Sequence, residues 1–207
     1  MMMILGLTGN IASGKSTVAG YFAEAGARLL SADQLAREVV RPGSQLLRQI
    51  VARFGAEVLQ ANGELNREVL SKLIFADPQA RQALNDMLHP AIAELSLQRL
   101  AELNADAATL VVYESPLLFE AAAEGRVDKV LVVTVDPQQQ LQRLMQRDAI
   151  DEQTARRRIA TQMSQDEKSS RADFVIDNSG TPEDCRKQVM TLAKTLYSQI
   201  RGRSKSH

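Results

Sequence analysis

The chain has 207 residues, enough for one substantial domain with an inserted subdomain. Lysine plus arginine equals aspartate plus glutamate, at 25 each, and this balance gives no support to bulk binding of nucleic acid or of a membrane surface. One cysteine and two histidines exclude an internal disulfide and a cysteine metal cluster, and they disfavour a zinc site.

No stretch is apolar for long enough to form a transmembrane helix, and the apolar N-terminus has no basic leader. We therefore expect a cytoplasmic protein. The sequence does not indicate the oligomeric state.

The first half of the chain begins with a short buried strand and then turns mostly helical. Strands are expected at residues 2–8 and 27–33, helices at 15–26, 33–40 and 44–55, and a tight turn at Asn62-Gly63. From Asn66 to Asn104 the pattern is almost wholly helical. It is punctuated at Asp77-Pro78 and at His89-Pro90, and the second proline predicts a helix-breaking joint.

The second half returns to strands. Nearly continuous apolar runs predict strands at 108–115 and 128–136, and a shorter strand is expected at 173–180. Polar, arginine-rich patterns predict helices at 137–148 and 151–172, and an amphipathic helix closes the chain at 181–200. Five strands interleaved with helices predict an α/β fold with a parallel, helix-covered sheet.

The segment "GNIASGKS", Gly9 to Ser16, fits the phosphate-binding pattern G-x-x-x-x-G-K-[ST] between a strand and a helix. Gly9 and Gly14 permit the tight path that turns backbone N–H groups inward, and the following helix adds the positive end of its dipole. Lys15 can reach the β- and γ-phosphates, the Ser16 hydroxyl can ligate Mg²⁺, and Thr17 can contact the α-phosphate. The motif predicts ATP binding, and the alternative is a strand–turn–helix joint with a solvated lysine.

A phosphate-binding loop does not by itself separate kinases from ATPases and GTPases. The chain has no N-K-x-D motif for reading guanine, which disfavours a GTPase switch. Small size and arginine-rich late helices favour a small-molecule kinase, because phosphoryl transfer needs positive charge around the migrating group.

Several polar residues lie where the sheet would meet a ligand, and each has two interpretations. Asp33 ends the second strand and is either a general base or a helix N-cap. Arg143 and Arg147 share a helix face and either contact phosphates or lie on a solvated face paired with Asp148, Asp151 or Glu152. Glu114 could hold Mg²⁺ through water or merely end a strand, and Asn178 could meet a nucleobase or belong to a turn.

The ordered set "GLTGNIASGKS", "SADQLAREVV", "LNREVLSKLIF", "LHPAI", "SPLLFE" and "ADFVIDNSG" resembles the dephospho-coenzyme A kinase family over about residues 4–180. The resemblance implies a three-layer P-loop kinase fold with a five-stranded parallel sheet, a helical substrate-binding subdomain at about 64–105 and a lid at about 143–170. It implies transfer of the ATP γ-phosphoryl group to the ribose 3′-hydroxyl of dephospho-coenzyme A, the last step of coenzyme A biosynthesis, with Mg²⁺.

The same resemblance assigns roles to individual positions. It places Asp33 as the base, Arg143 and Arg147 in the lid, and Asn178 on the adenine side. ATP phosphates would be held by Ala12, Ser13, Gly14, Lys15, Ser16 and Thr17, and the acceptor by Arg67, His89, Pro116 and Leu117.

This chain departs from the family pattern at four positions, one of which is Glu114, where the family often has aspartate; this disfavours a direct metal role for Glu114. Asn10 and Ala12 stand where glycine is common, which predicts a stiffer loop. Ser31 stands where the family commonly has a first aspartate, and this leaves Asp33 as the base candidate. A nucleoside or nucleotide kinase of similar build and a nucleotide-sensing switch remain the competing interpretations.

Overall fold

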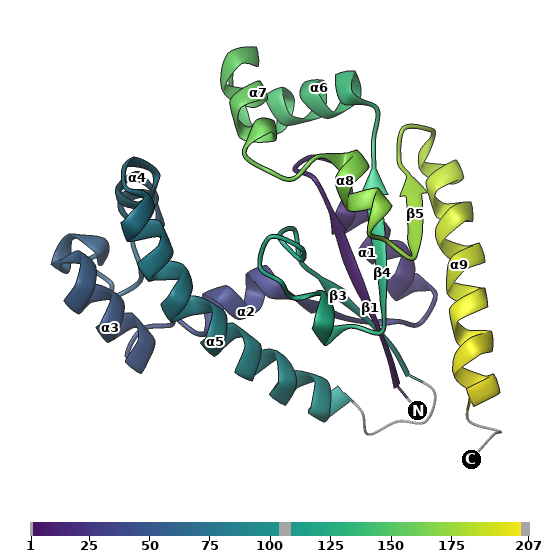
Figure 1. Cartoon of the computed structure of the whole chain (residues 1–207), viewed down its shortest axis with the longest axis horizontal. Helices are drawn as coiled ribbons and strands as arrows, with labels where there is room; N and C mark the ends of the chain where they lie inside the picture. The colour runs from purple at the N-terminus through teal and green to yellow at the C-terminus, as the bar shows by residue number, and fades with distance from the viewer. Residues whose placement is uncertain (1, 104–108, 204–207) are drawn as a thin grey trace. The chain divides into compact units, whose positions relative to one another are not determined.

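The computed structural model describes residues 2–103 and 109–203. The described residues form two compact units, one made of residues 2–31, 103 and 109–203 and the other of Ala32–Glu102. We refer to them as the sheet unit and the helical unit (Figure 1).

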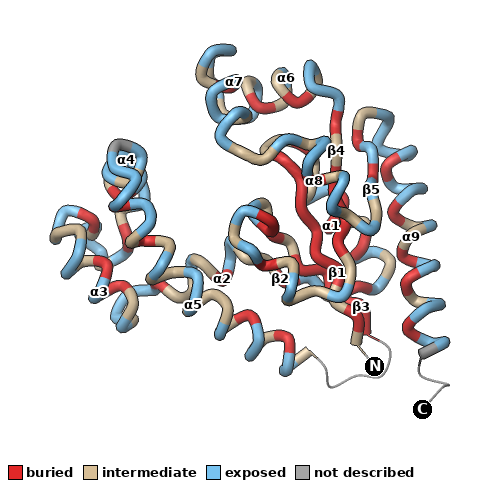
Figure 2. Tube along the Cα trace, viewed as in Figure 1, coloured by how far each residue is buried: buried red, intermediate tan, exposed pale blue. Residues whose placement is uncertain are grey.

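A five-stranded sheet organises the sheet unit. Its order is β2-β3-β1-β4-β5, and every neighbouring pair is parallel, as predicted. The strands are β1 (Met2–Gly9), β2 (Arg28–Ser31), β3 (Thr109–Glu114), β4 (Lys129–Thr134) and β5 (Phe174–Asp177). The central strands are buried almost throughout because side chains are covered on both faces of the sheet (Figure 2).

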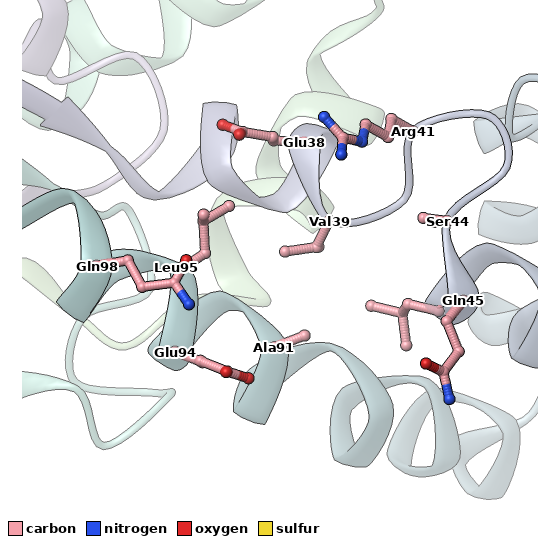
Figure 3. A pocket seen from close by; sticks show the side chains of 10 residues that line it. Glu38, Val39, Arg41, Ser44, Gln45, Ala91, Glu94, Leu95 and Gln98 are labelled. Carbon is pink, nitrogen blue, oxygen red and sulfur yellow. The ribbon is translucent and has the colours of Figure 1, made fainter.

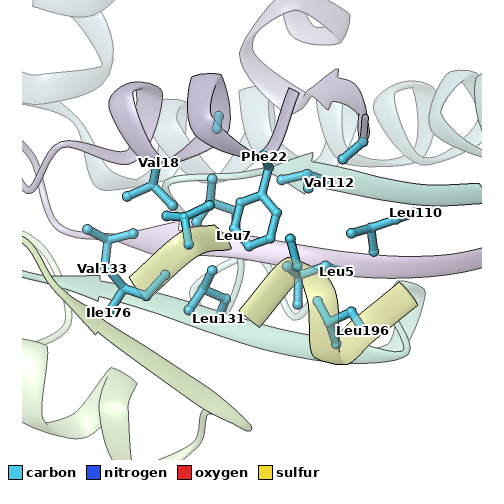
Figure 4. Close-up of a cluster of buried hydrophobic side chains, with 14 of the residues drawn as sticks. Leu5, Leu7, Val18, Phe22, Leu110, Val112, Leu131, Val133, Ile176 and Leu196 are labelled. Atoms are coloured by element: carbon cyan, nitrogen blue, oxygen red, sulfur yellow. The ribbon is translucent and has the colours of Figure 1, made fainter. Parts of the chain in front are cut away.

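Two helices cover one face of this sheet. α1 (Lys15–Glu24) and α9 (Pro182–Arg203) lie side by side against it, and alternate residues of the strands point toward them. Figure 4 shows the resulting core, in which Phe22 of α1 and Leu196 of α9 pack against Leu5, Leu7 and neighbouring aliphatic side chains. This core holds the carboxyl end of β1 rigidly where the glycine-rich loop begins.

The remaining helices of the sheet unit are short and capped by the polar residues that precede them. α6 (Pro137–Asp148), α7 (Glu152–Ala160) and α8 (Gln165–Ser170) follow Asp136, Asp151 and Ser164, and each cap side chain accepts a backbone N–H bond of the first turn. A short 3₁₀ helix, η2 (Glu124–Arg126), precedes β4. The pattern at 151–172 predicted one helix, and this was wrong because the chain leaves the helix after Ala160 and restarts at Gln165.

The helical unit contains four α-helices within its described residues. These are α2 (Ala32–Glu38), α3 (Gln45–Phe54), α4 (Arg67–Ala76) and α5 (Pro78–Leu103), with a 3₁₀ turn η1 (Ala56–Val58). Their core joins Ile50, Val58, Leu70 and Leu84 with other aliphatic residues. The predicted turn at Asn62-Gly63 is confirmed, with Gly63 at φ 79° between the bridged residues Leu59 and Leu65.

The predicted joint at His89-Pro90 was wrong, because α5 runs through it without a break. Proline in a helix interior removes one backbone hydrogen bond and costs about 3 kcal/mol. Buried residues on both sides of Pro90, namely Leu84, Ser96 and Leu100, anchor the two halves of the helix and offset that loss. The expected end of this block at Asn104 lies outside the described residues.

Candidate functional site

The glycine-rich loop leaves β1 at Gly9 and enters α1 at Lys15. Gly9 and Gly14 have φ values of 150° and 92°, which disfavour residues with a side chain. A Cβ atom at Gly9 would lie 2.5 Å from the Val133 carbonyl oxygen, and one at Gly14 would collide with the Asn178 side-chain nitrogen. Ala12 takes the left-handed conformation, at φ 60°, so the departure from glycine keeps a turn that glycine would favour.

The polar residues Lys15, Ser16 and Thr17 follow the loop and form the first turn of α1. The Lys15 amine donates a hydrogen bond to the Asn10 carbonyl oxygen of its own loop, at 3.0 Å. Ser16 and Thr17 are exposed in the first turn of α1. The backbone N–H groups of this turn have no helical carbonyl to bond, and they form the positive end of the helix.

Asn178 is hydrogen-bonded to the backbone of the glycine-rich loop. This residue follows β5 directly, and its side-chain nitrogen donates to the Ser13 carbonyl oxygen at 2.9 Å in a buried contact. Arg143 of α6 in turn donates to the Asn178 carbonyl oxygen at 3.0 Å. The sequence analysis did not predict this contact with the loop. The role of Asn178 on the adenine side, which the family resemblance implies, stays a prediction.

Three further hydrogen bonds tie the start of the loop to α6 and to the connection between α7 and α8. Ile11 donates its N–H to the Gln162 side-chain oxygen at 2.7 Å, and its carbonyl oxygen accepts from the Gln140 side chain at 2.8 Å. The Asn10 side-chain nitrogen donates to the Met163 carbonyl oxygen at 3.0 Å. We call these three contacts the loop latch. Asn10 and Ile11 belong to the phosphate-binding motif, whereas Gln140, Gln162 and Met163 belong to no motif and were missed by sequence reasoning.

A buried lysine, Lys168, bonds the turn that follows β3. Sequence reasoning did not predict this contact. Lys168 of α8 is fully buried, and its amine lies 2.9 Å from a Glu120 carboxylate oxygen and 3.1 Å from the Pro116 carbonyl oxygen. Pro116 is thereby held by its backbone, and the neighbouring Leu117 side chain remains 48% exposed. The turn thus presents an apolar side chain on a rigid support.

The two arginines of α6 have different surroundings, although they lie one turn apart. Arg143 donates to the backbone of Asn178 and to the Gln139 side chain. Arg147 pairs with Asp148 at 2.7 Å, and this hydrogen bond raises the pKa of the arginine and lowers that of the aspartate. Arg158 approaches the same carboxylate at 2.7 Å. Arg147 is therefore ion-paired with Asp148, as the solvated-face interpretation expects. Arg143 instead contacts Asn178, the residue that is bonded to the glycine-rich loop.

The helical unit carries the other predicted residues. Asp33 is the second residue of α2, so it lies in the first turn instead of at the capping position. Arg67 is the first residue of α4, and His89 is an exposed residue of α5. Partial burial and the nearby Arg37 charge lower the pKa of Arg67, and Asp33 counteracts them in part.

Two cavities open in the helical unit. One, of about 320 Å³, lies between the α2–α3 region and α5, and Figure 3 shows apolar side chains of Val39, Ala91 and Leu95 around it with polar residues at its edges. The other, of about 280 Å³, is lined by Arg37, Val40, Arg41, Pro42, Glu64, Leu65 and Arg67. We refer to them as the mixed cavity and the arginine cavity.

Glu114 ends β3, level with Leu7 of β1 and Ser31 of β2. Its assistance to Mg²⁺ stays a prediction. Within residues 2–103 and 109–203 no three His, Cys, Asp or Glu side chains are grouped to hold a metal ion.

Among the same residues, no helix is both long enough and apolar enough to cross a membrane. The cytoplasmic location also stays a prediction.

The family model for dephospho-CoA kinase matches residues 3–184. A dephospho-CoA kinase from Syntrophotalea carbinolica is 56% identical over 201 residues, which cover 97% of this chain and 95% of that protein.

Solved structures agree with this match. TT1252 from Thermus thermophilus has a TM-score of 0.78 at 34% identity, covering 93% of this chain and 97% of its own. Dephospho-CoA kinase from Campylobacter jejuni has a TM-score of 0.74 at 27% identity, covering 96% and 99%. The predicted three-layer P-loop kinase fold is confirmed by these likenesses.

Proposed function

Because the chain belongs to the dephospho-CoA kinase family, we propose that it transfers the γ-phosphoryl group of ATP to the ribose 3′-hydroxyl of dephospho-CoA. The products are CoA and ADP, and the reaction is the last step of coenzyme A biosynthesis. The observation that carries the proposal is the glycine-rich loop, formed between β1 and α1 with Gly9 and Gly14 in the conformations that a phosphate cradle needs.

ATP binding is assigned to the loop and the first turn of α1. Backbone N–H groups of this segment surround the phosphates, and the Lys15 amine exchanges the Asn10 carbonyl for a phosphate oxygen. The Ser13 hydroxyl is buried and has no hydrogen-bond partner among the described residues, and a phosphate oxygen would accept its proton. Residues assigned to ATP are Gly9, Ala12, Ser13, Gly14, Lys15, Ser16, Thr17 and Asn178.

Mg²⁺ fits the donors present. This ion favours oxygen ligands, keeps several waters and commonly joins substrate phosphates to one or two protein oxygens. The Ser16 hydroxyl is exposed in the turn that would meet those phosphates, and it is the protein group assigned to the metal. When bound, Mg²⁺ would neutralise charge on the phosphates.

The acceptor is assigned to Asp33, Arg67, His89, Pro116 and Leu117. In the chain, Asp33 comes two residues after the carboxyl end of β2, a strand that runs parallel with β1, whose carboxyl end leads into the glycine-rich loop. Its carboxylate would orient the 3′-hydroxyl and accept its proton as the new bond forms. Arg143 and Arg147 would offset charge on the migrating phosphoryl group when the lid closes.

An acceptor screen tests the proposal. The protein is incubated with ATP and Mg²⁺, and ADP is measured with dephospho-CoA, adenosine or a nucleoside monophosphate as the acceptor. Stoichiometric ADP is expected with dephospho-CoA, and adenosine should be much poorer. Phosphorylation of adenosine or of a nucleoside monophosphate at an equal or higher rate would contradict the proposed acceptor.

A further inference from the structure

Three arginines and one glutamate are among the residues that line the arginine cavity of the helical unit. Arg37 belongs to α2, Arg41 to the loop after it and Arg67 to the first turn of α4, and Glu64 is the acidic member. Three positive charges around one concave surface repel one another, and an anion would offset that repulsion.

Within the described residues, none of these three guanidinium groups makes a hydrogen bond or an ion pair. Arg99 in the same unit differs, since it pairs with Glu38 at 2.5 Å and with Glu102 at 3.0 Å. Partial burial lowers the pKa of Arg67, and the charge of Arg37 lowers it further, so the two arginines repel each other, while the charge of Asp33 opposes the effect. The cavity thus offers several planar N–H forks to a ligand.

We propose that Arg37, Arg41 and Arg67 form an anion site that binds the 5′-diphosphate of the acceptor and thereby places its 3′-hydroxyl at Asp33. This inference rests on the proposed function. It adds Arg37 and Arg41 to the acceptor site, and it assigns the charge of the cavity to one part of the ligand.

The spacing on α2 supports this arrangement. Asp33 and Arg37 are four residues apart and share a helix face, separated by about 6 Å along the axis. A nucleotide carries its 5′-phosphate and its 3′-hydroxyl on the same ribose. A hydroxyl held at Asp33 therefore brings the 5′-diphosphate within reach of a guanidinium one turn further along.

Size and overall charge favour a small anion. The cavity volume of about 280 Å³ equals roughly nine water volumes at ~30 Å³ each, which leaves room for a bridging diphosphate. The whole chain has a net charge of zero, so the arginines form a local concentration of charge and not part of a broad basic surface. Arg41 also lines the mixed cavity, which places a partly apolar surface beside the anion site for the uncharged arm of the acceptor.

Binding measurements on single variants test the site. Calorimetric titrations with dephospho-CoA and with adenosine are made on Arg37→Gln, Arg41→Gln and Arg67→Gln, with the glycine-rich loop filled by a saturating non-hydrolysable ATP analogue. Arg81→Gln removes the same charge from an exposed position of α5 outside the cavity and serves as the matched control. Thermal unfolding confirms that each variant is folded.

The dissociation constant for dephospho-CoA should rise roughly 10-fold or more in Arg37→Gln and Arg67→Gln, the magnitude of a lost charge-assisted hydrogen bond. That for adenosine, which lacks the diphosphate, should stay unchanged in every variant, and Arg81→Gln should match the parent for both ligands. Added salt should weaken dephospho-CoA binding more steeply in the parent than in the variants.

Three results would overturn the inference. The first is an unchanged affinity for dephospho-CoA in all three cavity variants. The second is an equal loss of affinity for adenosine and for dephospho-CoA. The third is a loss of affinity for the ATP analogue while the affinity for dephospho-CoA stays the same. Failure of the proposed function would give a different result. The parent protein would then bind dephospho-CoA through these arginines but would not phosphorylate it.

Discussion

At the scale of single residues, Lys15 gives the most direct test of the nucleotide site. Lys15→Ala should keep the fold, because the amine bonds the backbone of its own loop and contributes little to the core. The variant should lose most of the turnover, since the charge that stabilises the transferring phosphoryl group is removed. Turnover is measured as ADP release with dephospho-CoA, and thermal unfolding is the control. Equal activity in variant and parent would exclude the role given to Lys15.

Asp33 has two possible roles, and an asparagine substitution separates them. The residue lies in the first turn of α2, where a negative charge stabilises the helix by about 0.3–1 kcal/mol. Asp33→Asn removes the charge and the ability to accept a proton, and it keeps the size. We expect a small loss of thermal stability, unchanged ATP affinity and a turnover lower by roughly 10²–10⁴-fold. Normal turnover in the folded variant would leave helix stabilisation as its only role.

Arg143 and Arg147 should respond differently to lysine. Arg143→Lys loses a planar group that donates to the Asn178 carbonyl, and turnover should fall roughly 10-fold or more. Arg147→Lys should cause a smaller loss, through weaker phosphate contact in the closed lid. Steady-state kinetics with ATP as the varied substrate measures both, and Arg156→Lys on α7, where Arg156 pairs with Glu152, is the control. Unchanged kinetics in an Arg143→Lys, Arg147→Lys double variant would contradict a role for either guanidinium group in turnover.

At the scale of elements, the break between α7 and α8 has a tertiary cause. Residues 161–164 leave the helix, and in this segment Gln162 and Met163 bond the glycine-rich loop while Ser164 caps α8. A continuous helix would direct these groups elsewhere. The connection therefore couples the predicted lid to the loop that holds the phosphates.

Gln162→Leu tests that coupling. The substitution keeps a similar size and removes the acceptor of the Ile11 N–H, so ATP binding should weaken roughly 2–10-fold, the range expected for one hydrogen bond. Titration with ATP measures the effect, and dephospho-CoA affinity should not change. Gln153→Leu, at an exposed position of α7, is the matched control. An ATP affinity equal to that of the control would show that the contact does not position the loop.

At the scale of the whole molecule, several aspartates determine how stability responds to acid. Burial raises the pKa of the Asp173 carboxyl, but hydrogen bonds from the Lys129 amine at 2.6 Å and the Val130 N–H at 2.8 Å, with the lysine charge, hold it below its ordinary value of 3.8. Hydrogen bonds also lower the pKa of Asp151, through Thr154, and of Asp184, through Thr181.

These groups bind protons more weakly in the folded chain than in the unfolded chain. Their stabilisation is present above the unfolded pKa and is lost as the pH falls through the folded pKa. The free energy of unfolding, measured with urea, should therefore decrease as the pH is lowered from about 5 to about 3. Asp173→Asn should make this decrease smaller. Identical slopes in variant and parent would contradict the assignment of the Asp173 effect.

Sequence patterns alone were enough to predict the five strands and the phosphate-binding loop, because both are encoded locally, whereas the bounds of two helical segments were predicted wrongly. Apolar runs, helical spacing and the glycines of residues 9–14 depend on neighbours within a few positions, and all five strands and the start of α1 were predicted. The order of the sheet, by contrast, brings β1 between β3 and β4, and no local pattern contains that information.

The residues that support the glycine-rich loop became visible in the folded chain and not in the sequence. Asn178 bonds Ser13 across 165 positions, Gln162 bonds Ile11 across 151, and Lys168 reaches Pro116 across 52. Pro90 likewise remains helical because buried residues on both sides of it pack into the fold. The physical reason is common to these cases: a buried polar group or an interrupted helix gains its stabilisation from partners that the chain topology supplies, and residue type and local spacing do not specify those partners.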